Sequence, residues 1–183
     1  EDDRADFTDL KESTQHHLGE LVAMDRSIGA LRKGLSEAGI AENTIVWFNS
    51  DNGGRANYGP DTVGGLRGGK NQMYEGGLRV PCVIEWPEVI AAGRISGFPC
   101  GTVDIFPTIA EVVGLAPDEV MLKPYDGISL RSLFDTDIAK RDKPLGFRHD
   151  NRGVIIDNEY KYLNLKGKEE LYHLLDDKAE KNN

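Results

Sequence analysis

Apolar residues recur at helical spacing over the first part of the chain. Between residues 14 and 38, leucine, isoleucine and valine side chains return every three or four positions, at Leu18, Leu21, Val22, Ile28, Leu31 and Leu35. This spacing places them on one face of an α-helix, and Gly39 follows where a helix commonly ends. The pattern therefore predicts an amphipathic helix over about residues 14–38.

A nearly continuous run of strand-forming residues comes next. Residues 44–49 read T-I-V-W-F-N and are apolar on both faces, which is typical of a buried strand in a parallel sheet. A helix, a short loop and a buried strand together predict an α/β fold, with helices flanking a mainly parallel sheet. Ligands of such sheets bind beyond the carboxyl ends of the strands, and Asp51 and Asn52 stand at such an end.

The middle of the chain alternates between loops and short elements. Residues 53–77 show no sustained period and predict a long loop, of the kind that is usually functional or disordered. Residues 80–86 have strand character, and residues 104–113 predict a short helix with Asp104 at its N-cap and Gly114 beyond its end. Another short helix is expected near residues 129–134.

The last part of the chain has the pattern of an antiparallel sheet. Residues 146–149, 153–156 and 160–165 predict three short strands, with Asp157-Asn158 as a hairpin turn. We therefore divide the chain into an acidic lead-in (1–12), an α/β part (13–145) and a small antiparallel subdomain (146–183). The lead-in holds six acidic and two basic residues, which indicates a solvated, frayed segment.

The composition excludes several classes of partner. With 22 basic and 31 acidic residues the net charge is −9, which argues against nucleic acids and anionic membranes as partners. No stretch approaches the roughly 18 apolar residues of a membrane span, and no leader peptide opens the sequence. Cys82 and Cys100 are too few for a disulfide framework or a cysteine-rich zinc site, and whether they pair stays open.

Glycine is concentrated in one place. Nine of the 21 glycines fall between residues 53 and 77, and the segment G-G-L-R-G-G-K puts Arg67 and Lys70 into this flexible backbone. Glycines permit close approach of the backbone and expose N–H groups to an anion, and Lys70 offers a compact charge for a tetrahedral oxyanion. A mobile surface loop with exposed bases is the alternative interpretation.

Other polar residues are candidates for binding. Asp51 and Asn52 offer a carboxylate and an amide oxygen, part of the ligand shell that a hard divalent cation prefers, although Asp-Asn-Gly is also an ordinary turn sequence. Glu75 and Arg79 are expected to form a structural ion pair. Of the four histidines, His149 is the one we single out as a substrate contact, and the others are interpreted as surface or packing residues.

These segments in order resemble a known family. The chain contains N-T-I-V-W-F-N-S-D-N-G-G, then G-G-L-R-G-G-K-N-Q-M-Y-E-G-G-L-R-V-P, then D-I-F-P-T-I-A and finally E-L-Y-H-L-L-D-D. From about residue 17 onward it is similar to the C-terminal half of a type I sulfatase, the arylsulfatase family of the alkaline phosphatase superfamily. The resemblance implies an alkaline-phosphatase-like sheet and hydrolysis of a sulfate ester to an alcohol and inorganic sulfate.

The resemblance also implies roles for individual residues. In such sulfatases the Asp-Asn pair ligates calcium, in preference to magnesium, which corresponds to Asp51 and Asn52. The lysine of the glycine loop contacts the sulfate and contributes to catalysis, which corresponds to Lys70. The family nucleophile is a formylglycine made from Cys or Ser in a C/S-x-P-x-R motif, and neither Cys82 nor Cys100 lies in such a motif.

Because the nucleophile is missing, we interpret the sequence as a fragment that is inactive alone and needs its N-terminal half to complete the sheet and the site. The expected substrate is a sulfated small molecule or a sulfated glycan. Family members imply a periplasmic or extracellular location in bacteria and a lysosomal or secreted one in animals. The alternatives are a phosphodiesterase or phosphonate hydrolase of the same superfamily, and a non-catalytic fragment that binds an anion or a metal.

Overall fold

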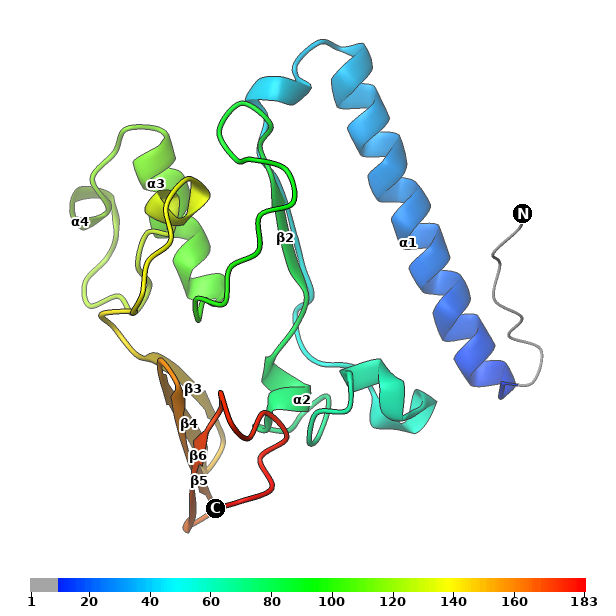
Figure 1. Ribbon diagram of the computed structural model, residues 1–183, viewed down its shortest axis with the longest axis vertical. Coiled ribbons are helices and arrows are strands. Elements are labelled where there is room, and N and C mark those ends of the chain that lie inside the picture. The colour runs from blue at the N-terminus through cyan, green and yellow to red at the C-terminus, as the bar shows by residue number, and fades with distance from the viewer. Residues whose placement is uncertain (1–9) are drawn as a thin grey trace.

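A computed structural model describes residues 10–183, so most of the predicted acidic lead-in lies outside the described residues. Helix α1 (Glu12–Glu37) runs along one side of the molecule, and Gly39 follows it with a left-handed φ of 70° (Figure 1). The predicted helix and its end are therefore confirmed. Much of its apolar stripe is exposed, including Leu21, Val22 and Leu31. Among the described residues, no helix is both long and apolar enough to cross a membrane.

The first sheet differs from the prediction in the direction of its strands. The short helix η1 (Ala41–Asn43) leads into β1 (Val46–Asn49), which pairs antiparallel with β2 (Cys82–Glu85). Parallel pairing was wrong for these two strands, and β1 is half-buried rather than buried. An apolar run shows that a strand can be covered on both faces, but it carries no information about the direction of its partner.

The glycine-rich stretch between these strands contains short helical turns rather than a continuous loop. They are η2 (Ala56–Tyr58), η3 (Pro60–Val63) and α2 (Glu75–Leu78). After β2 come η4 (Thr102–Asp104), α3 (Ile105–Val112), α4 (Pro117–Val120) and η5 (Arg131–Phe134). The two helices expected near residues 104–113 and 129–134 are thus present, and Gly114 ends α3 with a φ of 80°.

Asp104 precedes α3 as predicted, but its side chain does not cap that helix. The fully buried carboxylate accepts two hydrogen bonds of 2.8 Å from the Arg141 guanidinium, and further bonds from the N–H groups of Gly101 and Ile128. A buried charge must be paired and hydrogen-bonded to be tolerated, and here every partner comes from outside the helix. The pair fixes α3 to the segment that leads into the second sheet.

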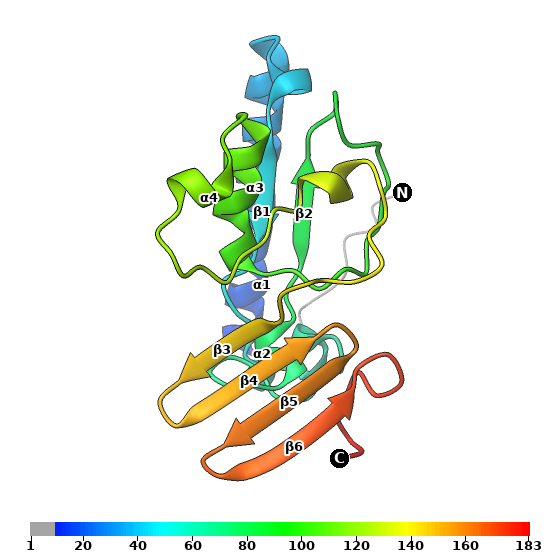
Figure 2. The ribbon, with the colours of Figure 1, turned by 90° about the vertical axis from the view of Figure 1, so that its left-hand side faces the viewer.

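The C-terminal part forms a four-stranded antiparallel sheet, as Figure 2 shows. Its strands follow one another in sequence order: β3 (Leu145–His149), β4 (Arg152–Asp157), β5 (Tyr160–Leu165) and β6 (Lys168–His173). The predicted small antiparallel sheet and the α/β class are confirmed, while β6 was missed. The buried core consists of Met73, Leu145, Val154, Ile156, Leu163 and Tyr172. Since Met73 comes from the glycine-rich stretch, this core joins that stretch to the sheet.

Candidate active site

Backbone hydrogen bonds bring the end of β1 against the glycine-rich stretch. The Gly53 N–H donates to the Gly77 carbonyl and the Lys70 N–H donates to the Gly54 carbonyl, both at 2.9 Å. Asp51 and Asn52 precede Gly53 directly, so their segment and the Lys70 segment lie side by side. The structure thus brings the two segments of the predicted site together.

Glycine is required at these contacts because the two backbones approach closely. A Cβ atom added to Gly53 would lie 1.7 Å from the Gly76 carbonyl oxygen, and one added to Gly77 would lie 2.1 Å from the Gln72 carbonyl oxygen. No real Cβ tolerates such distances. The N–H groups of Lys70, Gly76 and Gly77 are already bonded to carbonyls. The local glycine excess therefore serves backbone packing more than exposure of N–H groups to an anion.

We predict that Gly53→Ala disrupts this contact and strongly lowers the stability of the protein. The added methyl group can be accommodated only if one backbone moves away from the other, and that movement separates Asp51 from the Lys70 segment. The measurement is thermal unfolding, with Gly146→Ala as the matched control, since a Cβ at Gly146 in β3 meets nothing within 4 Å. Equal melting temperatures for the two variants would contradict the prediction.

Lys70 lies in a tight turn and has an exposed side chain. The Gln72 N–H donates to the Gly69 carbonyl at 2.9 Å, which closes a four-residue turn with Lys70 and Asn71 at its centre. Asn71 has a φ of 70°, a left-handed conformation that asparagine adopts more readily than most residues. The Lys70 ammonium makes no hydrogen bond or ion pair to any residue that the structure describes, so it is available to a ligand.

Arg67, the second cation of the predicted anion loop, has a structural role instead. Its guanidinium donates to the hydroxyls of Tyr172 and Tyr74, each at 2.9 Å, and to the Glu180 carbonyl at 2.8 Å. It also lies over the Tyr74 ring, 3.8 Å from the ring centroid. These bonds hold the glycine-rich stretch against the C-terminal sheet and tail, so the interpretation as a mobile surface loop is wrong for this segment.

A buried cluster of charges strengthens the same attachment. The Lys161 ammonium from β5 is fully buried and lies 2.8 Å from carboxylate oxygens of both Glu75 and Glu180. The second Glu180 oxygen accepts from the Glu75 N–H at 2.6 Å. Burial raises the pKa of Glu180, and Lys161 opposes that rise. The predicted ion pair between Glu75 and Arg79 is present at 3.9 Å, but the Lys161 ammonium lies much closer to the Glu75 carboxylate, at 2.8 Å.

A second charged group lies beside this cluster on β6. The Glu170 carboxylate is buried, and its hydrogen bond to the Lys168 ammonium is the main reason that its pKa is lowered to about 2. Burial raises the pKa of Tyr172 to about 12, and the hydrogen bond that its hydroxyl donates to Glu170 adds to this. Glu170 therefore stays ionised at neutral pH. Its carboxylate lies 3.5 Å from the Arg67 guanidinium and so pairs with the arginine that attaches the glycine-rich stretch to the sheet.

The two predicted metal ligands lie at the end of β1. Asp51 is exposed and Asn52 is half-buried, and neither side chain makes a hydrogen bond or ion pair with the residues that the structure describes. The Ser50 hydroxyl donates to the Asn52 carbonyl at 2.8 Å and so braces the backbone there. Within residues 10–183 no group of three or more His, Cys, Asp or Glu side chains could hold a metal ion. Asp51 and Asn52 can thus supply part of a ligand shell.

His149 lies at the end of β3 and is exposed. Its Nδ1 is 2.6 Å from the Arg152 guanidinium and 3.3 Å from the Asp150 carboxylate. Arg152 in turn donates to the Asn71 carbonyl at 3.0 Å. The structure therefore connects His149, through one arginine, to the turn that carries Lys70. Its predicted role as a substrate contact stays a prediction.

Neither cysteine has the character of a nucleophile. Both are free thiols. Burial raises the pKa of Cys100 to about 11, with Cys82 and Asp104 adding to the rise, and burial also raises the pKa of Cys82. A thiol with so high a pKa is almost entirely protonated at neutral pH. Since the thiolate is the reactive form of cysteine, such a thiol is a poor nucleophile.

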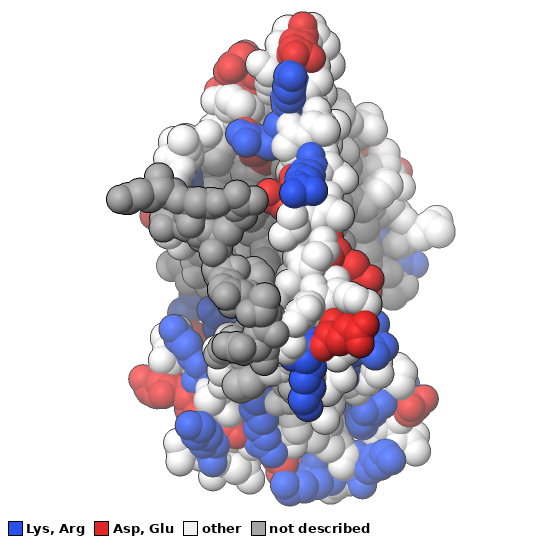
Figure 3. All heavy atoms as spheres, turned by 90° about the vertical axis from the view of Figure 1, so that its right-hand side faces the viewer, with Lys and Arg blue, Asp and Glu red and all other residues white. Residues whose placement is uncertain are grey.

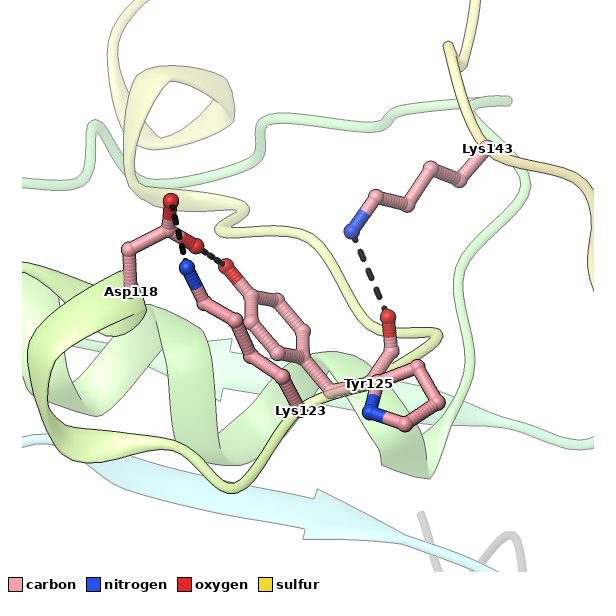
Figure 4. Close-up of a pocket in the computed structure, with 5 residues that line it drawn as sticks. Asp118, Lys123, Tyr125 and Lys143 are labelled. Atoms are coloured by element: carbon pink, nitrogen blue, oxygen red, sulfur yellow. Dashed lines mark hydrogen bonds and ion pairs between the residues drawn. The ribbon is translucent and has the colours of Figure 1, made fainter.

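Two cavities are lined by residues other than Asp51, Asn52 and Lys70. One of about 480 Å³, near α4, is lined by Asp118, Lys123, Pro124, Tyr125 and Lys143 (Figure 4). Its lysines are occupied, since Lys123 lies 3.3 Å from Asp118 and Lys143 donates to the Tyr125 carbonyl at 3.3 Å. The other cavity, of about 440 Å³, is lined by Gly65, Arg67, Ala179, Glu180 and Lys181. Residues of the glycine-rich stretch and of the C-terminal tail together line this cavity.

Local charge differs from the charge of the whole chain. Residues 52–79 hold four basic and two acidic residues, although the chain carries a net charge of −9. On the face shown in Figure 3, Lys and Arg side chains gather at the lower end of the molecule, the end where α2 and the C-terminal sheet lie in Figure 1. An anionic ligand is therefore not repelled from this end as the overall charge would suggest.

Comparison with known proteins identifies the family. Residues 1–115 match the family model described as Sulfatase, so the chain belongs to the sulfatase family. Mouse steryl-sulfatase is 36% identical over 137 residues, which cover 70% of this chain and 21% of that protein. Human steryl-sulfatase is 33% identical over 155 residues, covering 78% and 26% respectively. The chain thus spans about a quarter of the length of these relatives.

Solved structures agree with this assignment. The crystal structure of Ps i-CgsB in complex with k-i-k-neocarrahexaose superposes with a TM-score of 0.83 at 28% identity, covering 94% of this chain and 39% of that one. The PsFucS1 sulfatase from Pseudoalteromonas sp. superposes with a TM-score of 0.67 at 26% identity, and the match covers 89% of this chain and 37% of that one. The fold described above is therefore that of one part of a sulfatase.

Proposed function

We propose that this chain is the C-terminal part of an enzyme that hydrolyses a sulfate ester to an alcohol and inorganic sulfate. The observation that carries the proposal is the pair of backbone hydrogen bonds, Gly53 to Gly77 and Lys70 to Gly54, that join the two candidate segments. They place an unpaired ammonium on the segment next to a carboxylate and an amide. A sulfate ester gathers negative charge on its oxygens as it is cleaved, and fixed positive charge at that point stabilises the transition state.

In this proposal Asp51 and Asn52 hold a calcium ion. The donor set fits, because a carboxylate and an amide oxygen are hard ligands and both side chains are without partners among the described residues. Two side chains fill only part of the six to eight positions that calcium takes, so the remaining ligands come from elsewhere in the complete protein. When bound, the cation supplies Lewis-acid stabilisation of the sulfuryl oxygens.

Lys70 binds and orients the sulfate. Its ammonium is a point charge with three donors, which suits a tetrahedral oxyanion that offers no planar fork. The turn around Lys70 is held by backbone bonds before any ligand arrives, so the backbone that carries the charged side chain is positioned in advance. Such preorganised charge is the largest single contribution in many enzymes.

The nucleophile, a formylglycine, is proposed to lie in an N-terminal part that is not in this sequence, and the chain alone is expected to be inactive. Two observations support a missing part. Strand β1 is only half-buried, with β2 as its partner, and the apolar stripe of α1 is largely uncovered. A further sheet segment packed on both would complete the fold and add the missing ligands.

The names of the relatives support the proposed class of substrate. Steryl-sulfatases are named for sterol sulfates and N-acetylgalactosamine-6-sulfatase for a sulfated sugar, and Ps i-CgsB was solved in complex with k-i-k-neocarrahexaose. We propose a sulfated small molecule or a sulfated glycan as substrate. We also propose the location of the family: periplasmic or extracellular in a bacterium, lysosomal or secreted in an animal.

The test is a colour assay with an aryl sulfate. The complete protein that carries this segment is produced together with the enzyme that makes formylglycine, and release of the phenol is followed. We expect turnover of the aryl sulfate and at least about a hundredfold slower release from the matching aryl phosphodiester. Preference for the phosphodiester would favour a phosphodiesterase of the same superfamily, and binding without turnover of either would indicate a non-catalytic protein.

We predict that Asp51→Ala weakens calcium binding by at least about tenfold in the complete protein, because affinity depends on the number of charged ligands. The measurement is calorimetric titration of calcium into protein stripped with a chelator. Asp126→Ala is the matched control, since Asp126 is exposed and makes no hydrogen bond or ion pair among residues 10–183. Equal affinities in the two variants would remove Asp51 from the metal site.

A further inference from the structure

Arg152 connects two parts of the protein whose relative position matters for the proposed function, the Lys70 turn and the β3–β4 hairpin. It is the first residue of β4, and its side chain is 24% exposed. One terminal nitrogen donates to the Asn71 carbonyl at 3.0 Å, and the other lies 2.6 Å from Nδ1 of His149. The same guanidinium therefore touches the Lys70 turn and the end of the β3–β4 hairpin.

The contact with Asn71 acts on the turn that presents Lys70. That turn is held on one side by the Lys70 N–H bonded to Gly54, and is closed by the Gln72 N–H bonded to Gly69. Arg152 binds the carbonyl of Asn71, one of the two central residues of this turn, whose φ of 70° departs from an extended backbone. A donor at this point opposes rotation of the Asn71 peptide, and hence of the Lys70 backbone next to it.

The contact with His149 fixes the position of the imidazole. An arginine can only donate hydrogen bonds, so the 2.6 Å contact is a hydrogen bond to the neutral histidine whose ring proton lies on Nε2. The Asp150 carboxylate lies 3.3 Å from the same Nδ1 and 3.5 Å from the Arg152 guanidinium, so it holds both side chains at this end of the hairpin. The hairpin geometry supports this arrangement, since His149 and Arg152 are paired directly across β3 and β4 with a two-residue connection. His149 is thus held against the same arginine that binds the Lys70 turn.

We propose that Arg152 is a positioning residue of the sulfatase site: it ties the Lys70 turn to the C-terminal sheet and orients His149 beside it. This inference rests on the proposed function, because it gives Arg152 a role only through Lys70 and His149. It predicts that the C-terminal sheet contributes to catalysis through the position of a loop that is distant in sequence, and not only to stability.

The experiment measures kcat and KM of Arg152→Ala in the complete protein, alone and combined with Lys70→Ala. A small misplacement of a catalytic group costs up to about a hundredfold in rate, so we expect Arg152→Ala alone to lower kcat/KM by about 10- to 100-fold, mostly in kcat. In the Lys70→Ala background we expect Arg152→Ala to cost less than about twofold, since residues that act as one unit are not additive.

Two variants separate positioning from general damage. Arg152→Lys keeps one donor for the Asn71 carbonyl but cannot also contact His149, so its rate should lie between those of the wild type and Arg152→Ala. Arg148→Ala is the matched control, because Arg148 is exposed on β3 and makes no hydrogen bond or ion pair among the described residues. It should have the wild-type rate.

The outcomes distinguish this inference from the proposed function. If Lys70→Ala is slow but Arg152→Ala has the wild-type rate, Arg152 does not position the loop, and the proposed function stands. The inference is equally overturned if Arg152→Ala costs as much in the Lys70→Ala background as it does alone, or if Arg148→Ala costs as much. If Lys70→Ala itself has the wild-type rate, the role of Lys70 fails, and with it the proposed site.

Discussion

Replacement of Lys70 by alanine in the complete protein is expected to lower kcat/KM by about 100- to 1000-fold, the usual loss when one preorganised contact to a developing oxyanion is removed. The structure gives two reasons. The backbone around Lys70 is held by hydrogen bonds to Gly54 and within its turn, so the point from which the side chain extends is fixed in advance. Its ammonium makes no contact with the described residues that would have to be broken before it meets a sulfate.

The same variant should leave stability almost unchanged, because an exposed side chain without partners contributes little to folding. Thermal unfolding of Lys70→Ala therefore accompanies the kinetic assay. Lys178→Ala is the matched control, since Lys178 is also exposed and unpaired among residues 10–183. A wild-type rate for Lys70→Ala, or an equal loss for Lys178→Ala, would exclude Lys70 as the sulfate contact.

Replacement of Lys161 by methionine is expected to give the largest loss of stability. Methionine has nearly the same length, but it leaves the buried carboxylates of Glu75 and Glu180 without their shared cation. Removing one partner of a buried ion pair typically costs about 3–5 kcal/mol in the free energy of unfolding, because the remaining charge is uncompensated. Chemical denaturation of the complete protein measures this loss, and Lys178→Met gives the baseline for a surface lysine.

A compensating variant tests the physical reason. If the loss comes from uncompensated charge, then Glu75→Gln together with Glu180→Gln in the Lys161→Met background should recover part of it, since neutral amides are cheaper to bury than carboxylates. Further destabilisation by the two glutamines would show that packing of these side chains, rather than their charge, holds the glycine-rich stretch to the sheet.

Local sequence patterns were sufficient for much of the fold. The helix from residue 14 and its end at Gly39, the short helices near residues 104–113 and 129–134, and three strands of the C-terminal sheet are all present. Each follows from the spacing of apolar residues and from glycine positions, which act over a few residues. Strand β6 was missed because it begins K-E-E, which has little strand propensity, and only its pairing with β5 makes it a strand.

The candidate site residues could be predicted from the sequence, but the long-range contacts that hold their segments in place could not. A strand-terminal Asp51-Asn52 and a lysine in a glycine-rich stretch are visible in the sequence, and their segments do meet. The partners of Glu75 lie 86 and 105 residues away in the chain, and no local pattern carries such pairings. One signal was present: Lys161 lies two residues from Leu163 in a strand, which places a charge on the buried face.

The arginine of the glycine-rich stretch shows the same limit. Arg67 and Lys70 look alike in the sequence, as two cations in one flexible segment. Only the fold distinguishes them, because Arg67 is enclosed by two tyrosine hydroxyls and a carbonyl of the tail, while Lys70 is exposed. Which cation is available to a ligand is thus decided largely by Tyr172 in the C-terminal sheet and Glu180 in the tail, which lie 105 and 113 residues further along the chain.

The most direct measurement is a crystal structure of the complete protein with calcium and sulfate bound. We expect the Lys70 Nζ within about 3 Å of a sulfate oxygen. The Asp51 and Asn52 side-chain oxygens should lie about 2.3–2.6 Å from a cation that contacts the same sulfate. A sulfate bound with Lys70 directed away from it, or a cation coordinated without Asp51 and Asn52, would contradict a shared site for these three residues.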